Sequence, residues 1–356
     1  MVVTMQDVAR RAGVALSTVS ATLTSARPVS AATRARVQAA MDELGYRPNA
    51  LARGLASRHS RVLALTYPVG AAGLSRTSAE FVLGAAAGAQ ERGYQLVLWP
   101  FAVDDGVGVL EVARQGLAEG VLVMEVHLED ARVRGLRAAG VPTALIGRTA
   151  GDTDLPSVDV DFEATLHDAV EHLVALGHRR IAFVNHAAHR VAEGHGPTVR
   201  AAAAYERAMR LRGLTSRQVH ADESVTGGRV AVRLLLADAE APTAVVTMNE
   251  DATFGVVAEL GARGVAVPGD VSVLAVVSSP AVTGQSVPPL TTLHAPGAEL
   301  GRAGVDVLLA LLGVGTPPPP AVLACRLVDC GSTGPAPTGT PVRAVGVAPA
   351  VAAAAP

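Results

Sequence analysis

Residues 4–57 constrain the fold of this chain more than any other stretch, because apolar residues recur there at helical spacing between turn residues. A first helix is predicted over residues 5–12 and ends at Gly13, where glycine can adopt the left-handed backbone of a turn. A second helix is predicted over residues 16–23 and a third over residues 31–44. Two short helices joined by a glycine turn and pinned by a third are typical of a helix-turn-helix.

Capping residues predict where these helices begin and end. Thr4 followed by Asp7 is close to a capping box, in which each side chain bonds the backbone N–H of the other residue. Ser30 is placed to cap the third helix, and Gly45 is placed to end it.

Charge is distributed unevenly along the chain. Residues 1–61 hold nine arginines against three acidic residues, a net charge of +6, whereas the remainder holds twenty-one arginines against twenty-nine acidic residues, a net charge of −8. A basic end on an acidic body is typical of a DNA-reading module attached to another domain. A merely solvated basic face would explain the charge but not the helix spacing. The chain has no lysine, which excludes a phosphate-binding Gly-Lys-Ser/Thr loop and a Schiff-base lysine.

The length of 356 residues predicts two or three domains. No apolar run reaches the roughly 18 residues of a membrane span, and charged residues interrupt the N-terminus where a signal peptide would be apolar. We therefore expect a cytoplasmic protein without a membrane partner. Cys325 and Cys330 are expected to be reduced thiols rather than a disulfide or a zinc site.

From Val62 onward, apolar runs alternate with amphipathic helices, which predicts parallel sheets covered on both faces by helices and arranged in two α/β lobes. The predicted strands are residues 62–67, 95–99, 120–124, 142–147, 181–185, 244–248, 271–277, 290–294 and 321–328.

The N-terminal stretch resembles the headpiece of the lactose-repressor (LacI/GalR) family of bacterial transcription regulators. The matching fragments, in order, are Asp7-Val-Ala-Arg-Arg-Ala-Gly-Val, Ser17-Thr-Val-Ser, Val29-Ser, Thr33-Arg-Ala-Arg-Val and Glu43-Leu-Gly-Tyr-Arg-Pro-Asn-Ala-Leu-Ala-Arg. The body resembles the effector domain of that family, which is similar to periplasmic sugar-binding proteins, through fragments such as Leu176-Gly-His-Arg-Arg-Ile. The resemblance covers about residues 2–333.

The resemblance implies a helix-turn-helix headpiece (1–47), a hinge helix and linker (48–60) and a two-lobed effector-binding and dimerisation domain (61–333). It places lobe 1 at about 61–158 and 290–318, lobe 2 at about 161–287 and 321–333, and the crossings between lobes near 157–161, 287–291 and 317–321. Residues 334–356 are rich in Pro, Ala, Gly and Thr and are predicted to form a disordered tail.

For DNA, the resemblance places base contacts at Leu16, Ser17 and Ala21, a set in which two side chains can meet only apolar groups such as a thymine methyl. The residues placed for phosphate contact are Thr4, Thr18, Ser20, Ser30 and Thr33. Thr18 and Ser20 can also be read as ordinary helix-surface residues.

The resemblance also implies a hinge helix over Asn49–Ser57 that lies in the minor groove, with Leu55 as a wedge between base steps, Ala52 small enough for two hinges to touch and Arg53 set for a phosphate. The alternative is a flexible linker in which Leu55 is simply packed.

In the effector cleft the match is thinner. Ala201 stands where the family has an arginine, one position from Arg200, and Ser278-Ser279 replaces an acidic residue. Having fewer carboxylates, the cleft is expected to be less suited to sugar hydroxyls, so a sugar is not specified. The candidate effector-binding residues are Arg148, Asp161, His186, Arg200, Asn249, Glu250 and Ser278.

The resemblance places a histidine-rich loop where loops of the family face the cleft. His186, His189, Glu193 and His195 could bind a metal or sense pH, but a solvated loop is expected because no helix is predicted to fix them. No metal or cofactor is expected. No catalytic motif such as G-x-S-x-G or H-E-x-x-H occurs, so the chain is not expected to be an enzyme.

These patterns predict a homodimeric transcription regulator, more specifically a repressor, that binds a palindromic operator in double-stranded DNA under control of a small-molecule effector. The alternatives are a regulator with a degenerate, ligand-independent cleft and a solute-binding receptor. The sequence names neither the effector nor the target genes, and it leaves activation and tetramer formation open.

Overall fold

The computed structural model of the chain describes residues 3–24, 27–46, 60–68, 74–102, 104–151, 155–238, 240–316, 318–319 and 321–338. The chain divides into two compact units, of which one contains the first three helices and the other contains both sheets. No helix among the described residues combines the length and apolar composition that a membrane span requires.

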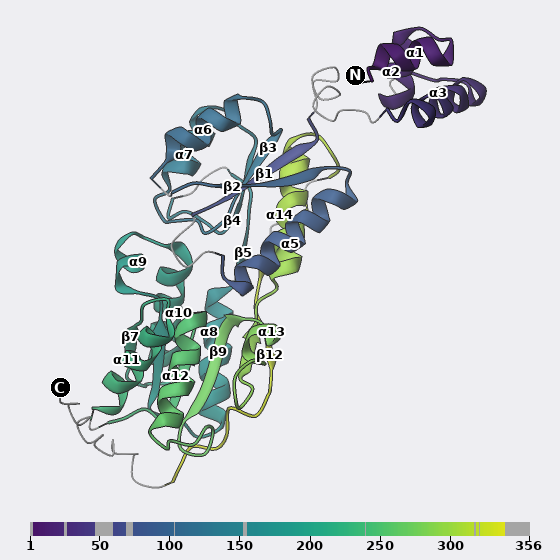
Figure 1. The fold of residues 1–356 in the computed structure, drawn as a ribbon. Coiled ribbons are helices and arrows are strands. Elements are labelled where there is room, and N and C mark those ends of the chain that lie inside the picture. The colour runs from purple at the N-terminus through teal and green to yellow at the C-terminus, as the bar shows by residue number, and fades with distance from the viewer. Residues whose placement is uncertain are drawn as a thin grey trace, which may run out of the picture. The chain divides into compact units, whose positions relative to one another are not determined.

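The N-terminal unit consists of α1 (Met5–Ala12), α2 (Leu16–Thr24) and α3 (Ala31–Leu44), coloured purple in Figure 1. Its core consists of small and branched apolar side chains that the three helices bury together: Val8, Ala9, Ala12, Val19, Val37, Ala40 and Met41. The predicted capping box is confirmed, since Thr4 Oγ1 accepts from Asp7 N and Thr4 N donates to Asp7 Oδ2. We refer to this unit as the headpiece.

The turn after α1 is fixed from α3. Gly13 has φ of 61°, the left-handed conformation expected of it. The guanidinium of Arg36 on α3 donates to the carbonyl oxygens of Ala12 and Gly13, with Nη2–O distances of 2.8 and 3.0 Å. The cationic side chain therefore satisfies carbonyl groups that the end of α1 leaves without helical partners.

Lobe 1 of the body contains a six-stranded sheet in the order β11-β5-β4-β3-β1-β2. Its strands are β1 (Val62–Tyr67), β2 (Gln95–Pro100), β3 (Gly120–Val123), β4 (Thr143–Ile146), β5 (Ser157–Val160) and β11 (Ala321–Leu323). Its helices are α5 (Arg76–Glu91), α6 (Gly106–Arg114), α7 (Ala131–Ala138) and α14 (Gly297–Leu311). Glycines let α5 and α14 approach closely, because a Cβ on Gly84 would lie 2.3 Å from the Ala298 oxygen.

Lobe 2 contains a second six-stranded sheet, ordered β12-β10-β9-β8-β6-β7, in which β12 runs antiparallel to β10. Its strands are β6 (Ile181–Asn185), β7 (Gln218–His220), β8 (Ala244–Thr247), β9 (Ser272–Ser278), β10 (Thr291–His294) and β12 (Arg326–Val328). Its helices are α8 (Phe162–Ala175), α9 (Ala188–Ala192), α10 (Gly196–Leu211), α11 (Val225–Leu236), α12 (Glu250–Ala262) and α13 (Pro280–Thr283). The predicted class of covered, mainly parallel sheets is confirmed.

Three predictions about the body are wrong in detail. The last predicted strand is two strands, because the chain leaves lobe 1 after β11 and joins lobe 2 as β12. β10, assigned to lobe 1 by sequence, pairs with β9 in lobe 2. The crossings therefore fall after β5, between β10 and α14, and between β11 and β12. In addition, β7 was not predicted.

The predicted disordered tail begins too early. Within 334–338, Gly334 accepts a hydrogen bond at its carbonyl from the buried His178 ring, with an Nε2–O distance of 3.0 Å, and Ala336 N donates to Leu176 O at 2.8 Å. These residues are thus part of lobe 2, and residues 339–356 lie outside the described part of the chain.

Candidate functional sites

The headpiece presents the first turn of α2 as its candidate base-reading surface. Leu16 is 47% exposed, and Ser17 beside it is also exposed. Ala21, by contrast, is only 5% exposed. The methyl group of Ala21 is therefore mostly covered by protein in the headpiece as it is folded here, and the expected contact of Ala21 with a base stays a prediction.

The residues expected to contact phosphate already have partners within the headpiece. The Ser30 hydroxyl donates to Thr33 Oγ1 at 2.9 Å, and Thr18 Oγ1 accepts from Arg27 Nη2 at 3.3 Å. Thr4 is held in the capping box, and Ser20 also has a partner. The hinge residues Asn49, Ala52, Arg53 and Leu55 lie outside the described residues.

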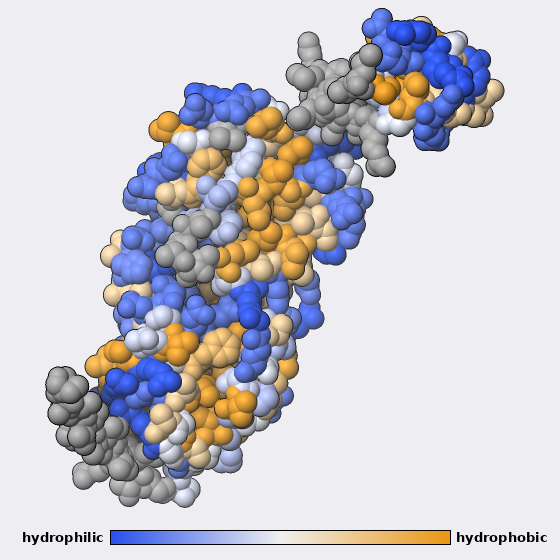
Figure 2. Space-filling view, in the orientation of Figure 1, coloured by the Kyte–Doolittle hydropathy of each residue, from blue (hydrophilic) through white to orange (hydrophobic). Residues whose placement is uncertain are grey.

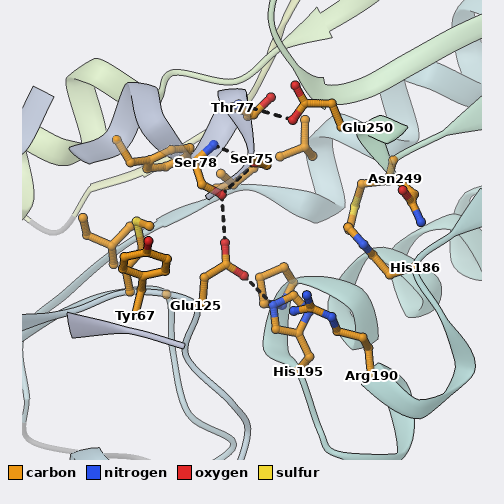
Figure 3. Close-up of a pocket in the computed structure, with 18 of the residues that line it drawn as sticks. Tyr67, Ser75, Thr77, Ser78, Glu125, His186, Arg190, His195, Asn249 and Glu250 are labelled. Atoms are coloured by element: carbon orange, nitrogen blue, oxygen red, sulfur yellow. Dashed lines mark hydrogen bonds and ion pairs between the residues drawn. The ribbon is translucent and has the colours of Figure 1, made fainter. Parts of the chain in front are cut away.

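In the body, a cavity of about 190 Å³ lies between the two lobes. Its walls include the apolar groups of Leu74, Phe81, Phe162 and Met248, while the polar side chains labelled in Figure 3 come from both lobes. Such an apolar lining with a few convergent polar groups is typical of a small-molecule site.

Glu125, which follows β3, is the central polar residue of this cavity. Its Oε1 accepts from the Ser78 hydroxyl at 3.1 Å, and its Oε2 lies 2.6 Å from Nε2 of His195 in lobe 2 (Figure 3). Burial alone would raise the pKa of Glu125, but the hydrogen bond with His195, the charge that this imidazole acquires once it is protonated at low pH, and the nearby Arg190 lower it to about 2. Glu125 is therefore a carboxylate at neutral pH.

His195 is a neutral donor in this pair. Burial lowers the pKa of its imidazole, although the hydrogen bond to Glu125 opposes that effect. Nδ1 lies 2.6 Å from the Thr198 hydroxyl, so the neutral ring accepts there and donates from Nε2 to Glu125.

A buried ion pair supports the backbone that carries Glu125. Glu125 has φ of 53°, a left-handed conformation that is costly for a residue with a side chain. Nη2 of Arg132, which is fully buried, donates to the carbonyl oxygens of Met124 and Glu125 at 3.3 and 3.2 Å and to Asp130 Oδ2 at 2.7 Å. Asp130 in turn caps α7 and accepts from His127 N.

Backbone hydrogen bonds join the lobes beside this pair. Leu128 N donates to Gly194 O at 2.7 Å, and Gly196 N donates to Val126 O at 3.1 Å. We call residues 125–128 and 193–196 the inter-lobe seam. Its antiparallel bridge between His127 and His195 adds a non-covalent connection to the three crossings of the chain.

Two further carboxylates of the cavity accept hydrogen bonds, one from groups of its own lobe and the other from the opposite lobe. Glu223 Oε1 accepts from His186 Nδ1 and Arg190 Nε, each at 3.1 Å, and although burial alone would raise its pKa, these neighbours bring it to about 2. Glu250 Oε2 accepts from Thr77 N, at the start of α5 in the opposite lobe, at 3.4 Å.

Of the seven predicted effector residues, His186, Asn249 and Glu250 line the cavity, whereas the other four do not. The side chain of Asn249 forms its hydrogen bonds within lobe 2. Its Oδ1 caps α12 by accepting from Ala252 N, and its Nδ2 donates to Ala221 O.

The other four candidates have structural partners instead. Arg148 Nε and Arg200 Nη2 lie 3.0 and 3.4 Å from Oδ2 of Asp159, and Asp161 caps α8. Ser278 is buried at the end of β9, and its carbonyl accepts from Ala295 N.

The histidine-rich loop is not solvated throughout, contrary to expectation. The short helix α9 lies within it, and His195 is 2% exposed as the N-cap residue of α10. No three His, Cys, Asp or Glu side chains of the described residues are placed to hold a metal ion.

Sequence reasoning missed the lobe 1 wall of the cavity: Tyr67, Ser75, Thr77, Ser78 and Glu125. A usable signal existed, since ligands of parallel α/β sheets bind beyond the carboxyl ends of the strands. Tyr67 ends β1 and Glu125 comes soon after β3, so both could have been found by that rule.

The headpiece and the two-lobed body together define a class, namely helix-turn-helix proteins carrying a periplasmic-binding-like domain. The family described as "Bacterial regulatory proteins, lacI family" matches residues 4–49, and "Periplasmic binding protein-like domain" matches residues 170–333. The transcriptional regulator AglR of Rhizobium meliloti (strain 1021) is 31% identical, covering 96% of this chain and 97% of its own length. The ribose operon repressor of Escherichia coli (strain K12) is 33% identical, with coverages of 86% and 92%.

Solved structures agree with this assignment. The transcriptional regulator CelR in complex with cellobiose is 28% identical with a TM-score of 0.67, covering 93% of this chain and 99% of its own. The lac repressor dimer bound to operator and the anti-inducer ONPF shares the fold, with a TM-score of 0.79 at 24% identity and coverages of 94% and 100%. This chain belongs to the LacI family of bacterial regulatory proteins and is a DNA-binding transcriptional regulator.

Proposed function

We propose that this chain is a repressor that binds a two-fold symmetric operator as a homodimer, with an affinity set by a small molecule in the inter-lobe cavity. The observation that carries this proposal is one chain combining a helix-turn-helix headpiece with a cavity whose polar walls come from two lobes. A ligand held by both lobes binds one lobe arrangement more tightly than another, and so shifts the population between them.

The proposed base contacts are Leu16 and Ser17, on the exposed first turn of α2. The proposed phosphate contacts are Thr4, Thr18, Ser20, Ser30 and Thr33. The proposed hinge residues are Asn49, Ala52, Arg53 and Leu55, with Arg53 set for a phosphate, Leu55 as a wedge between base steps and Ala52 small enough for two hinges to touch. Because the base-reading pair offers one hydroxyl and one apolar surface, it cannot make the bidentate bonds that read guanine or adenine strongly. We infer that specificity depends in part on the deformability of the operator.

The homodimer proposal is supported by exposed apolar side chains on lobe 1. Figure 2 shows apolar surface where α5 and α14 lie in Figure 1, and Leu83 on α5 and Leu311 on α14 are 68% and 48% exposed. Leu98, on the edge strand β2, is 45% exposed. We propose that a second copy of the chain covers this face, because contiguous exposed apolar surface marks interaction sites.

The relatives named above are transcriptional regulators rather than enzymes, and we propose no catalytic role for the chain. The cytoplasm, where operator DNA lies, is the proposed location. The proposed organisation is a headpiece (1–47), a hinge (48–60) and a two-lobed domain that extends through residue 338.

The test is a binding selection of the full chain on randomised duplexes. We expect enrichment of one motif with two-fold symmetry and loss of that enrichment in Leu16→Asp, which places a negative charge against the bases. Leu211→Asp is the matched control, because Leu211 is also exposed but lies on α10 of the body. Absence of any enriched symmetric motif with the parent protein would contradict the proposal.

A further inference from the structure

Two buried oxygen atoms of the cavity lack hydrogen-bond partners. They are Oε1 of Glu250, on the first residue of α12, and Oγ1 of Thr77, in the first turn of α5. Thr77 is only 8% exposed, and both residues line the cavity from opposite lobes. They are neighbours, since Thr77 N donates to the other carboxylate oxygen of Glu250 at 3.4 Å (Figure 3). A buried polar atom without a partner costs free energy that a bound donor would recover.

The missing partner must be a donor, because a carboxylate oxygen can only accept. Burial raises the pKa of Glu250, and the charge of Arg76 is the weakest of the influences that lower it. Asp251, the next residue, also lines the cavity. The Ser75 side chain also lowers the pKa of Glu250 through a hydrogen bond, and Arg76 is the basic residue whose charge acts on it.

The other carboxylates of the cavity are already neutralised or fully bonded. Glu223 has Arg190 and His186, and Asp159 has Arg148 and Arg200. Both oxygens of Glu125 accept hydrogen bonds, from Ser78 and His195. Among the described residues, negative charge that no ion pair neutralises is thus concentrated at the end of the cavity formed by Glu250 and Asp251. An anionic ligand would be repelled there, and a cation would be attracted.

We propose that the ligand of this cavity carries a primary ammonium group, which donates to Glu250 Oε1 and Thr77 Oγ1 and so bridges the two lobes. This inference rests on the proposed function of the cavity as the effector site. The apolar lining of the cavity, which includes Leu74 and Phe81, fits a compact amine whose body is partly apolar.

The test uses nitroxides that differ only in one substituent: 4-amino-TEMPO, its trimethylammonium analogue, 4-hydroxy-TEMPO and 4-carboxy-TEMPO. Methyl-labelled methionines report whether a nitroxide occupies the cavity, because Met124 and Met248 line it. Met209, which is buried in lobe 2 and does not line the cavity, serves as the control. We expect the amine to broaden the Met124 and Met248 signals about tenfold more than the carboxylate does, as a focused negative potential concentrates cations. The amine should also exceed the trimethylammonium probe, which has the charge but no N–H to donate.

Two variants assign the effect to this end of the cavity. Glu250→Gln and Asp251→Asn should each reduce the preference for the amine several-fold, while Glu206→Gln, on the exposed face of α10, should leave it unchanged. Equal broadening by the amine and the carboxylate, or a preference unaffected by Glu250→Gln, would overturn the proposal. Equal broadening by the amine and the trimethylammonium probe would overturn the role of the N–H donors. None of these outcomes bears on operator selection, which tests the proposed function separately.

Discussion

The carboxylate of Glu125 and the imidazole of His195 meet across the two lobes, with Oε2 and Nε2 2.6 Å apart. One residue follows a strand of the first sheet, and the other precedes a helix that packs on the second. Because each also has a second partner, Ser78 and Thr198 respectively, the pair is fixed in direction as well as in distance. Three of the following predictions concern the seam that this pair anchors.

The stability of the body should fall as the pH is lowered below about 6.5. The pKa of His195 is lower in the folded protein than the 6.5 of the unfolded chain. The contribution of His195 to the free energy of unfolding is therefore complete above pH 6.5 and is lost on acidification. Glu125 has its pKa lowered from 4.5 to about 2, so its contribution is lost between those values. Urea unfolding at a series of pH values measures how the free energy of unfolding changes with pH. Glu125→Gln should flatten this dependence between pH 4.5 and 3, whereas Glu206→Gln should not.

Gly196→Ala should open the seam. A Cβ at this position would lie 2.5 Å from the Val126 carbonyl oxygen, which Gly196 N itself bonds, so the two strands of the seam must separate. We expect a loss of about 1–3 kcal/mol in the free energy of unfolding. Gly261→Ala is the matched control, since this helical glycine has no atom within 4 Å of a new Cβ and should gain about 0.5–1 kcal/mol. A stabilised Gly196→Ala would show that the seam does not constrain the chain.

Arg132→Met should destabilise lobe 1 by about 3–5 kcal/mol, because it leaves the buried carboxylate of Asp130 without its cation. The double variant Arg132→Met/Asp130→Asn should recover much of this loss, since the amide keeps an acceptor for capping α7 and carries no charge. Thermal unfolding of both variants measures the difference, with Arg134→Met, an exposed neighbour, as the control. Equal unfolding temperatures for Arg132→Met and Arg134→Met would contradict the supporting role of the pair.

Arg36→Met should loosen the headpiece without affecting the body. It removes the hydrogen bonds to the carbonyl oxygens of Ala12 and Gly13, a loss of about 1–3 kcal/mol for a charged donor. Hydrogen exchange of the α1 amides should accelerate, while protection of the body strands should stay the same. Arg34→Met, exposed on the same helix, should leave the α1 amides protected.

Operator binding should depend steeply on salt. If two headpieces neutralise about six to ten phosphates, the affinity should fall by roughly 10³–10⁵ between 50 and 200 mM salt. Fluorescence anisotropy with the selected operator measures the slope. A flat response would argue against the basic headpiece as the DNA-binding surface.

The sequence predicted the headpiece well because its signals are local: a capping box at Thr4, glycines at 13 and 45, and apolar residues at helical spacing. It also predicted the alternation of strands and helices. The split of the last strand could not be predicted, because β11 and β12 are separated by only two residues and both read as one apolar run. The sequence alone could not tell which sheet each half would join.

The cavity was predicted less completely, for a physical reason. Glu125 could have been found from its place after a strand, but its positive φ depends on the buried Arg132, whose burial no local pattern indicates. His195 lay among polar residues, which favoured a solvated loop. Its burial comes from the opposite lobe, a contact between residues 70 positions apart.

The arrangement of β11 and β12 has a consequence for biosynthesis. Each is the outermost strand of its sheet, beside β5 in one lobe and β10 in the other, and Cys325 between them is held through its N–H by Thr165 Oγ1 at 3.1 Å. Neither lobe can complete its sheet until residues 321–328 have left the ribosome, so a chain stopped before Ala321 leaves both β5 and β10 with unpaired edges. One short segment, residues 321–328, thus supplies the edge strands that complete the sheets of both lobes.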